Sequence, residues 1–219
     1  MEHRREDLER TGEQYNPGAP TTPRQAASVI VLRGGDSDLE VLLVKRNPES
    51  RFMGGAWVFP GGAVDAGEVG EGDAAHRAAA LRELAEEANV VLTDPAALVP
   101  FSRWITPAQV RIRFDTRFFL TPLPEGAEPR PDGGETVDAG WFAPQAALDA
   151  HRRGEILLVF PTIKHLEQLG GFASADALLE HSRGREVRPV EPRVLVSGET
   201  ARVVLPGEPG YEDPDTLGS

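Results

Sequence analysis

Apolar positions along this chain follow two periods, one typical of strands and one typical of helices. Short apolar runs predict strands at residues 26–32, 41–44, 56–59, 97–105, 111–120 and 135–142. Helical spacing predicts helices at residues 73–89, 144–153, 162–169 and 174–181. We therefore expect an α/β fold, in which helices cover the faces of a mixed sheet.

The helix predicted at 73–89 has one apolar side and one acidic side. Leu84 lies on the apolar stripe, whereas Glu83, Glu86 and Glu87 lie off it. Their spacing of i, i+3 and i+4 places the three carboxylates next to each other on the helix surface. Because like charges at this spacing repel, we expect a cation to offset them, and a hard divalent ion with oxygen ligands is the natural candidate. A solvated acidic helix face is the plain alternative.

Two neighbouring features favour the metal site over that alternative. Arg82 stands inside the acidic run, and Phe59-Pro60-Gly61-Gly62 precedes the helix. The proline and glycines are expected to end the strand at 56–59 with a turn, because glycine accepts backbone conformations that other residues avoid. The predicted order is thus a strand, a glycine turn and a helix with one chelating side.

These residues resemble the box of the Nudix hydrolases, written G-x5-E-x7-R-E-U-x-E-E-x-G-U, where U is aliphatic. Gly62 and Glu68 match its first half, and residues 82–90 match its second half. The resemblance implies an α/β/α sandwich over residues 24–181 and a hydrolase that cleaves diphosphate linkages.

This chain departs from the Nudix box at two places. Residues 69–81 separate Glu68 from Arg82, which is thirteen residues where the pattern has seven, so the box carries an insertion. Glu71 and Asp73 are alternatives for the position given to Glu68. The last glycine of the pattern is Asn89, a residue that also accepts the left-handed backbone found just past a helix end.

The resemblance also implies roles for individual residues. Mg²⁺ or Mn²⁺ would be bound by Glu83, Glu86 and Glu87, and one of these glutamates would orient or deprotonate the attacking water. Arg82 would pair with Glu68 and hold the loop against the helix. A backbone carbonyl of Gly61 or Gly62 would complete the metal shell, since glycine lets the backbone approach closely. Glu135 is a further ligand or base candidate, with a solvated carboxylate at a strand start as the alternative.

A second resemblance, to the coenzyme A diphosphatase branch of this family, lies upstream. Its pattern is L-L-T-x-R-[SA]-x3-R-x3-G-x3-F-P-G-G, and Arg46, Arg51 and Gly55 are in register with it, whereas Val44 and Asn47 depart from it. Arginine suits phosphate contacts because its planar fork donates two parallel hydrogen bonds.

This register favours coenzyme A or an acyl-CoA as the small-molecule substrate, bound by Arg46 and Arg51 together with Gly61 and Gly62. A diphosphatase for ADP-ribose or a nucleotide sugar is the alternative within the enzyme class. A Nudix module that binds without turnover is the alternative outside it.

The composition limits which binding partners and which cellular compartment we expect for this protein. The formal net charge of −12 argues against a nucleic-acid partner, because such affinity comes mostly from Lys and Arg on phosphates. The chain has no cysteine, so disulfides and cysteine zinc sites are excluded. A charged N-terminus without an apolar core and the lack of a membrane-length apolar run predict a cytoplasmic protein.

The chain is expected to contain one domain with two appendages. Residues 1–23 are polar and rich in glycine and proline, so they are expected to form a mobile arm. Residues 182–219 form a C-terminal extension of short apolar pieces between turns. Three fates are open for this extension: it closes the sheet, it packs on a second subunit in a homodimer, or it lies loose.

Overall fold

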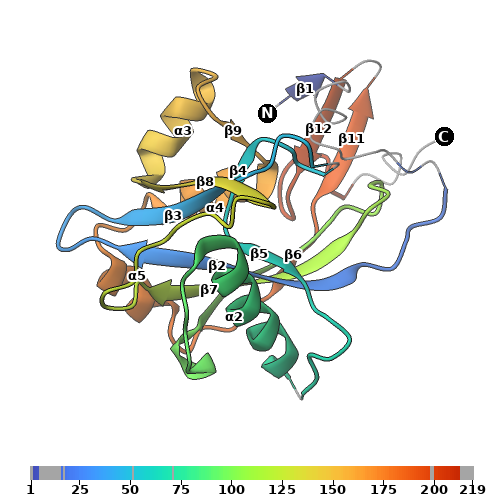
Figure 1. Ribbon diagram of the computed structural model, residues 1–219. Coiled ribbons are helices and arrows are strands. Elements are labelled where there is room, and N and C mark those ends of the chain that lie inside the picture. Colours follow the sequence, from blue (N-terminus) through green and yellow to red (C-terminus); the bar gives the residue numbers. More distant parts are fainter. Residues whose placement is uncertain are drawn as a thin grey trace.

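The computed structural model describes residues 2–4, 16, 18–50, 52–70, 72–197 and 200–212. A nine-stranded mixed sheet lies at its centre, with strand order β10-β6-β7-β2-β3-β4-β9, while β5 pairs with β2 and β8 pairs with β3 (Figure 1). Its strands are β2 (Arg24–Arg33), β3 (Glu40–Arg46), β4 (Ala56–Val58), β5 (Gly61–Ala63), β6 (Val99–Ile105), β7 (Phe114–Pro122), β8 (Thr136–Phe142), β9 (Leu157–Leu158) and β10 (Pro189–Val190).

Helices cover both faces of this sheet, which confirms the predicted α/β/α sandwich. They are α2 (Ala74–Ala88), α3 (Pro144–Arg152), α4 (Phe160–Leu169), α5 (Ala175–Ser182) and the short 3-10 helix η1 (Pro95–Ala97). Side chains of β2 alternate between the two faces, as the pleat requires. Ile30 packs with α3, α4 and α5, whereas Val29 and Val31 pack with α2 and its Leu84.

Strand β2 changes its neighbour along one edge. It pairs with β7 in parallel along nearly its whole length, from Arg24 to Leu32. On its other edge, β3 pairs only with Leu32 and Arg33, and β5 pairs with residues 26–28. Strand β3 continues with β4 and β8 instead. Consequently β2 and β3 diverge. The backbone at residues 61–62 pairs with β2 on one side and contacts Glu87 of α2 on the other.

The elements predicted from the sequence are present, with one correction. Gly61 and Gly62 do not form a turn: they lie in β5 and pair with Ser28 and Ala27. Neither glycine has a positive φ angle. A Cβ atom on Gly61 would lie 2.4 Å from the carbonyl oxygen of Ala27. The glycines are therefore explained by close backbone approach rather than by a turn conformation.

The inserted segment 69–81 has two parts. Residues 69, 70, 72 and 73 lie in a loop, and residues from Ala74 onward form the first turns of α2. Asp73 forms an ion pair with Arg117 on β7, which ties the start of the helix to the sheet.

The end of α2 has the left-handed residue that was predicted. Asn89 has φ 54° and ψ 31°, and its N–H donates to the carbonyl of Ala85. We expect Asn89→Ala to lower the free energy of unfolding by about 1 kcal/mol, because a Cβ without a compensating side-chain contact is disfavoured in this conformation. Asn89→Gly should keep the stability at or above that of the parent protein. Urea denaturation of both variants measures the difference, and an equal loss in both would contradict the explanation.

Residues 2–4 pair with strands of the C-terminal extension in a second, three-stranded sheet of order β1-β12-β11. Its strands are β1 (Glu2–Arg4), β11 (Arg193–Ser197) and β12 (Thr200–Val204), drawn at the upper right of Figure 1. Residues 2–4 thus have regular structure, which corrects the expectation of an arm without structure for that part. Residues 5–15 lie outside the described residues, and their mobility stays a prediction. The domain limits at 23 and 181 also stay predictions.

The C-terminal extension is attached to the body of the protein. Strand β10 adds to the edge of the central sheet beside β6. The carboxylate of Glu191 lies 2.6 Å from the guanidinium of Arg113, and the backbone carbonyl of Glu191 accepts a hydrogen bond from the Tyr211 hydroxyl at 2.8 Å. The extension therefore closes the sheet and packs on the domain, and a homodimer stays an open prediction. No helix in the described part of the chain is long and apolar enough to span a membrane.

Candidate active site

Helix α2 presents two buried carboxylates to the backbone of β5. Only 3% of the Glu87 side chain and 11% of the Glu83 side chain are exposed. The N–H of Gly61 donates to Glu87 Oε2 at 2.9 Å. A Cβ atom on Gly62 would lie 2.2 Å from Glu83 Oε1, so only glycine leaves room for the Glu83 carboxylate there. The strand, the glycines and the acidic side of the helix therefore meet as the sequence predicts.

Burial makes this pair of carboxylates resist ionisation. It raises the pKa of Glu87 to about 7, although the Gly61 N–H and Arg46 act in the opposite direction, and the charges of Glu83 and Glu135 raise it further. Burial also raises the pKa of Glu83, against the effect of Arg82. Buried negative charge that is only partly balanced favours the binding of a cation.

Arg82 holds the acidic residues in place. Its Nε donates to Glu68 Oε1 at 2.9 Å, and its Nη1 donates to Glu83 Oε1 at 2.7 Å and to Glu86 Oε2 at 3.0 Å. Its Nη2 donates to the carbonyl of Ala63 at 3.0 Å, so one guanidinium links the loop, β5 and the helix. The predicted contact between Arg82 and Glu68 is thus present.

One of the two alternatives to Glu68 does not take its place. Asp73 pairs with Arg117 instead of Arg82. Glu71 lies outside the described residues.

The other predicted site residues differ in whether they line the pocket with Glu83 and Glu87. Arg46 lines the same pocket as Glu83 and Glu87, and its Nη1 lies 3.5 Å from Glu87 Oε1. Glu135 is exposed but also lines this pocket. Glu86 is 59% exposed and joins the cluster through Arg82 rather than by facing the pocket. Arg51, predicted to bind phosphate, lies outside the described residues.

A divalent metal fits these donors. The described residues contain no group of three or more acidic or histidine side chains already arranged around one point. Mg²⁺, however, typically takes one or two carboxylates and completes its shell with waters and substrate phosphates. Glu83 and Glu87 supply such a pair of hard oxygen donors. Arg82 lies 2.7 Å from Glu83, whereas Glu87 has only Arg46, at 3.5 Å, among the cations of the described residues. The arrangement therefore suits a metal that is bound together with its substrate.

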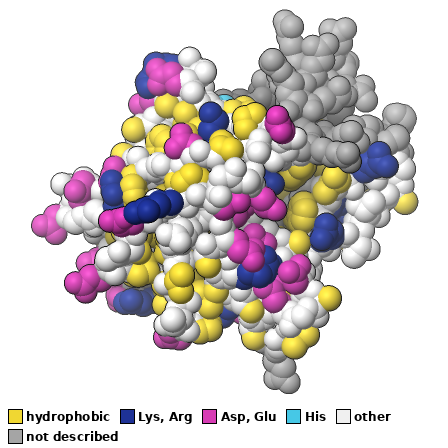
Figure 2. Space-filling view, in the orientation of Figure 1, with side chains coloured by type: hydrophobic (Ala, Val, Ile, Leu, Met, Phe, Trp, Pro, Cys, Tyr) yellow, Lys and Arg dark blue, Asp and Glu magenta, His cyan; other side chains and the backbone are white. Residues whose placement is uncertain are grey.

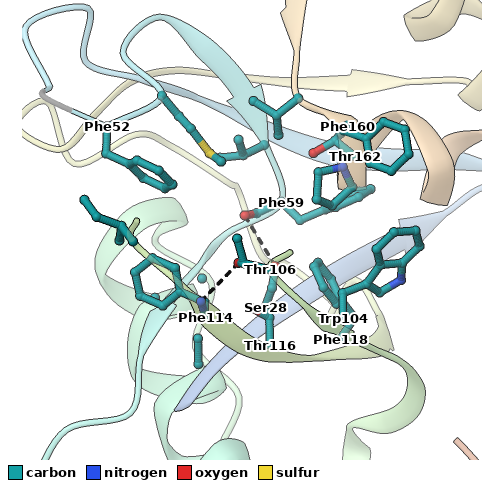
Figure 3. Close-up of a pocket in the computed structure, with 18 of the residues that line it drawn as sticks. Ser28, Phe52, Phe59, Trp104, Thr106, Phe114, Thr116, Phe118, Phe160 and Thr162 are labelled. Atoms are coloured by element: carbon teal, nitrogen blue, oxygen red, sulfur yellow. Dashed lines mark hydrogen bonds between the residues drawn. The ribbon is translucent and has the colours of Figure 1, made fainter. Parts of the chain in front are cut away.

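Glu83 and Glu87 line a pocket of about 420 Å³. The remaining walls are mostly apolar, and Figure 3 shows Phe52 and Phe114 on one side with Trp104, Phe118 and Phe160 on the other. Figure 2 shows acidic side chains gathered beside a hollow with hydrophobic side chains. These apolar walls, called the apolar half of the pocket below, were not predicted. Their residues come from segments far apart in the sequence, and each segment alone has the pattern of an ordinary hydrophobic core.

The α/β/α sandwich and the acidic pocket at the diverging strands agree with the resemblance of the sequence to the Nudix hydrolases. The NUDIX domain family model matches residues 22–160, which is more than half of the chain. The chain therefore belongs to the Nudix family, and it is a Nudix diphosphohydrolase.

Three known proteins illustrate the similarity. The acyl-coenzyme A diphosphatase NUDT19 of Homo sapiens is 25% identical, over 92% of this chain and 84% of its own length. The crystal structure of a NUDIX hydrolase from Alicyclobacillus acidocaldarius is 29% identical with a TM-score of 0.65, covering 73% of this chain and 96% of that one. The NUDIX domain of Shewanella oneidensis NrtR, complexed with ADP ribose, is 22% identical with a TM-score of 0.50, covering 71% of this chain and 91% of that one, and it is similar in fold alone.

Proposed function

We propose that this Nudix hydrolase uses Mg²⁺ or Mn²⁺ to cleave the diphosphate linkage of coenzyme A or an acyl-CoA. The observation that carries the proposal is the buried pair Glu83 and Glu87 in the wall of a pocket that is otherwise mostly apolar. Such a pocket suits a substrate with a charged diphosphate and a long, weakly polar arm. The upstream register of Arg46 and the name of the human relative support the same substrate class.

In the proposed reaction, water attacks one phosphorus atom and the bond from that phosphorus to the bridging oxygen breaks. The products would be 3′,5′-ADP and a phosphopantetheine. Glu83 and Glu87 would hold the metal, with Glu135 and the Gly62 carbonyl as further oxygen donors from the pocket. Glu86, which lies outside the pocket lining, would act on the metal through a bridging water. When bound, the metal would neutralise phosphoryl charge and activate the water.

The protein's own groups would position the reactants. Arg46 lies beside Glu87, and its buried Nε has no hydrogen-bond partner among the described residues. This arginine would therefore donate to a phosphate oxygen. Arg82 would keep Glu83 and Glu86 oriented, because both carboxylates accept hydrogen bonds from its Nη1.

We expect metal-dependent release of 3′,5′-ADP from coenzyme A species, and a loss of more than about tenfold in Glu86→Gln. The assay compares coenzyme A, an acyl-CoA, ADP-ribose, NADH and dGTP in Mg²⁺ and in Mn²⁺. Glu167→Gln, an exposed carboxylate on α4, is the matched control and should keep full activity.

Two alternatives have distinct outcomes in the same assay. Preferential turnover of ADP-ribose or a nucleotide sugar would retain the chemistry and reject the coenzyme A assignment. Absence of turnover with all five compounds, in the presence of measurable binding, would support a Nudix module that binds without cleaving.

A further inference from the structure

The apolar half of the pocket, meaning its walls away from Glu83 and Glu87, includes residues from three parts of the chain that lie outside the Nudix box. Ile105 and Val110 come from the end of β6 and the loop that follows it, and Phe160 comes from the start of α4. Val194 and Val203 come from β11 and β12 of the C-terminal extension. The extension is thus a wall of the pocket as well as an appendage.

One polar group in this half has unused hydrogen-bonding capacity. Gln109 lines the pocket, and both polar atoms of its side-chain amide are buried with no hydrogen-bond partner in the described part of the chain. Its backbone carbonyl accepts a hydrogen bond from the N–H of Asn16 at 2.7 Å, which holds the loop in place. An unpaired buried amide destabilises the free protein, so its presence in a pocket points to a ligand that pairs with it.

The chemistry of that ligand follows from the surroundings of Gln109. A carboxamide offers one acceptor and two donors, and it is best matched by a group that both donates and accepts. Val110, Ile105 and Val203, which line the same pocket, offer no polar side-chain atom, so the rest of the ligand along them must be apolar. A secondary amide within an aliphatic chain meets both requirements.

We propose that the apolar half of the pocket, closed by the C-terminal hairpin β11–β12, binds the amide-bearing aliphatic chain of the substrate, and that Gln109 pairs with an amide of that chain. This inference rests on the proposed function and adds the position of one substrate arm to it. In coenzyme A the chain is the pantetheine arm, which carries two secondary amides. The nucleotide would then lie on the other side of the carboxylates.

Binding measured without turnover tests this placement. Isothermal titration in EDTA compares coenzyme A with 3′,5′-ADP, which has no pantetheine arm. Gln109→Leu should weaken coenzyme A binding roughly tenfold, since one paired amide is lost, and should leave 3′,5′-ADP binding unchanged. Its thermal midpoint should stay equal or rise, because an unpaired buried amide is removed. Gln168→Leu, at an exposed position on α4, is the matched control.

A second variant tests the wall formed by the extension. Val203→Phe should shorten the apolar half and raise the KM for a long-chain acyl-CoA about tenfold or more relative to acetyl-CoA, with little change in kcat. Val91→Phe, which is exposed on the loop after α2, controls for the added ring.

The outcomes separate this placement from the proposed function. Unchanged coenzyme A binding in Gln109→Leu, or an equal loss for 3′,5′-ADP, would overturn the placement even if coenzyme A is cleaved. A selective loss of coenzyme A binding without cleavage by the parent protein would support the placement and reject the proposed activity. No binding of coenzyme A to the parent protein would overturn the placement.

Discussion

Glu87→Gln is expected to reduce kcat by more than about 10²-fold, because even the partners of metal ligands typically contribute 10- to 100-fold. The amide can still accept the hydrogen bond from the Gly61 N–H, so β5 should stay in place. It cannot supply the negative charge that a divalent metal requires. Steady-state kinetics over a range of Mn²⁺ concentrations will distinguish weaker metal binding from a slower chemical step. Activity within tenfold of the parent protein would exclude Glu87 as a metal ligand.

The same substitution should change how stability depends on pH in the metal-free protein. The pKa of Glu87 is about 7 in the folded protein, whereas the ordinary value is 4.5. Between these values the folded state binds more protons than the unfolded state, so the contribution of Glu87 to stability is complete below about pH 4.5 and is lost as the pH rises to about 7. The loss amounts to about 3 kcal/mol at neutral pH.

Glu87→Gln removes this titration, so it should be more stable than the parent protein at pH 8 and similar to it at pH 4.5. The raised pKa of Glu83 acts in the same direction and remains in both proteins. Urea midpoints measured in EDTA at several pH values test the difference. Parallel pH curves for the two proteins would show that Glu87 ionises normally.

Gly62→Ala is expected to lower kcat/KM by about 10²-fold while the protein still folds. The added Cβ would lie 2.2 Å from Oε1 and 2.5 Å from Cδ of Glu83, well inside contact distance. Because the backbone of β5 is fixed by its pairing with β2, the Glu83 carboxylate is the group that must move. A displacement of about 1 Å at a reacting centre can reduce the rate roughly 10²-fold.

A glycine nearby provides a matched control for this variant. Gly67 has no described atom within 4 Å of the position of an added Cβ, and its φ angle is not in the left-handed region. Gly67→Ala should therefore keep its activity and its urea midpoint. If Gly62→Ala were equally active, the contact between Gly62 and Glu83 would have no role in catalysis.

Local chemistry in the sequence predicted much of the acidic part of the pocket. The helical spacing of Glu83 and Glu87 and the left-handed backbone of Asn89 depend on residues within one element, and the structure contains both. The contact between Arg82 and Glu68 was also predicted, because the family pattern pairs these positions. The catalytic roles of these residues stay predictions.

The remaining features depend on contacts that a single segment does not reveal. Gly61 and Gly62 have the composition of a turn, but the reason for them is the proximity of Ala27 and Glu83, which are distant in sequence. Gln109 shows no motif, and its importance comes from an unpaired amide that only packing defines. The apolar half of the pocket is likewise assembled from residues whose patterns match ordinary core.

The pairing of residues 2–4 with the C-terminal extension in sheet β1-β12-β11 has a consequence for substrate preference. Val203 belongs to that sheet and lines the pocket, so the binding surface is complete only when β12 is in place. A nascent chain that stops before β11 would carry every carboxylate of the cluster but lack one wall. Removal of β11 and β12 is therefore expected to alter substrate preference while leaving Glu83 and Glu87 in place.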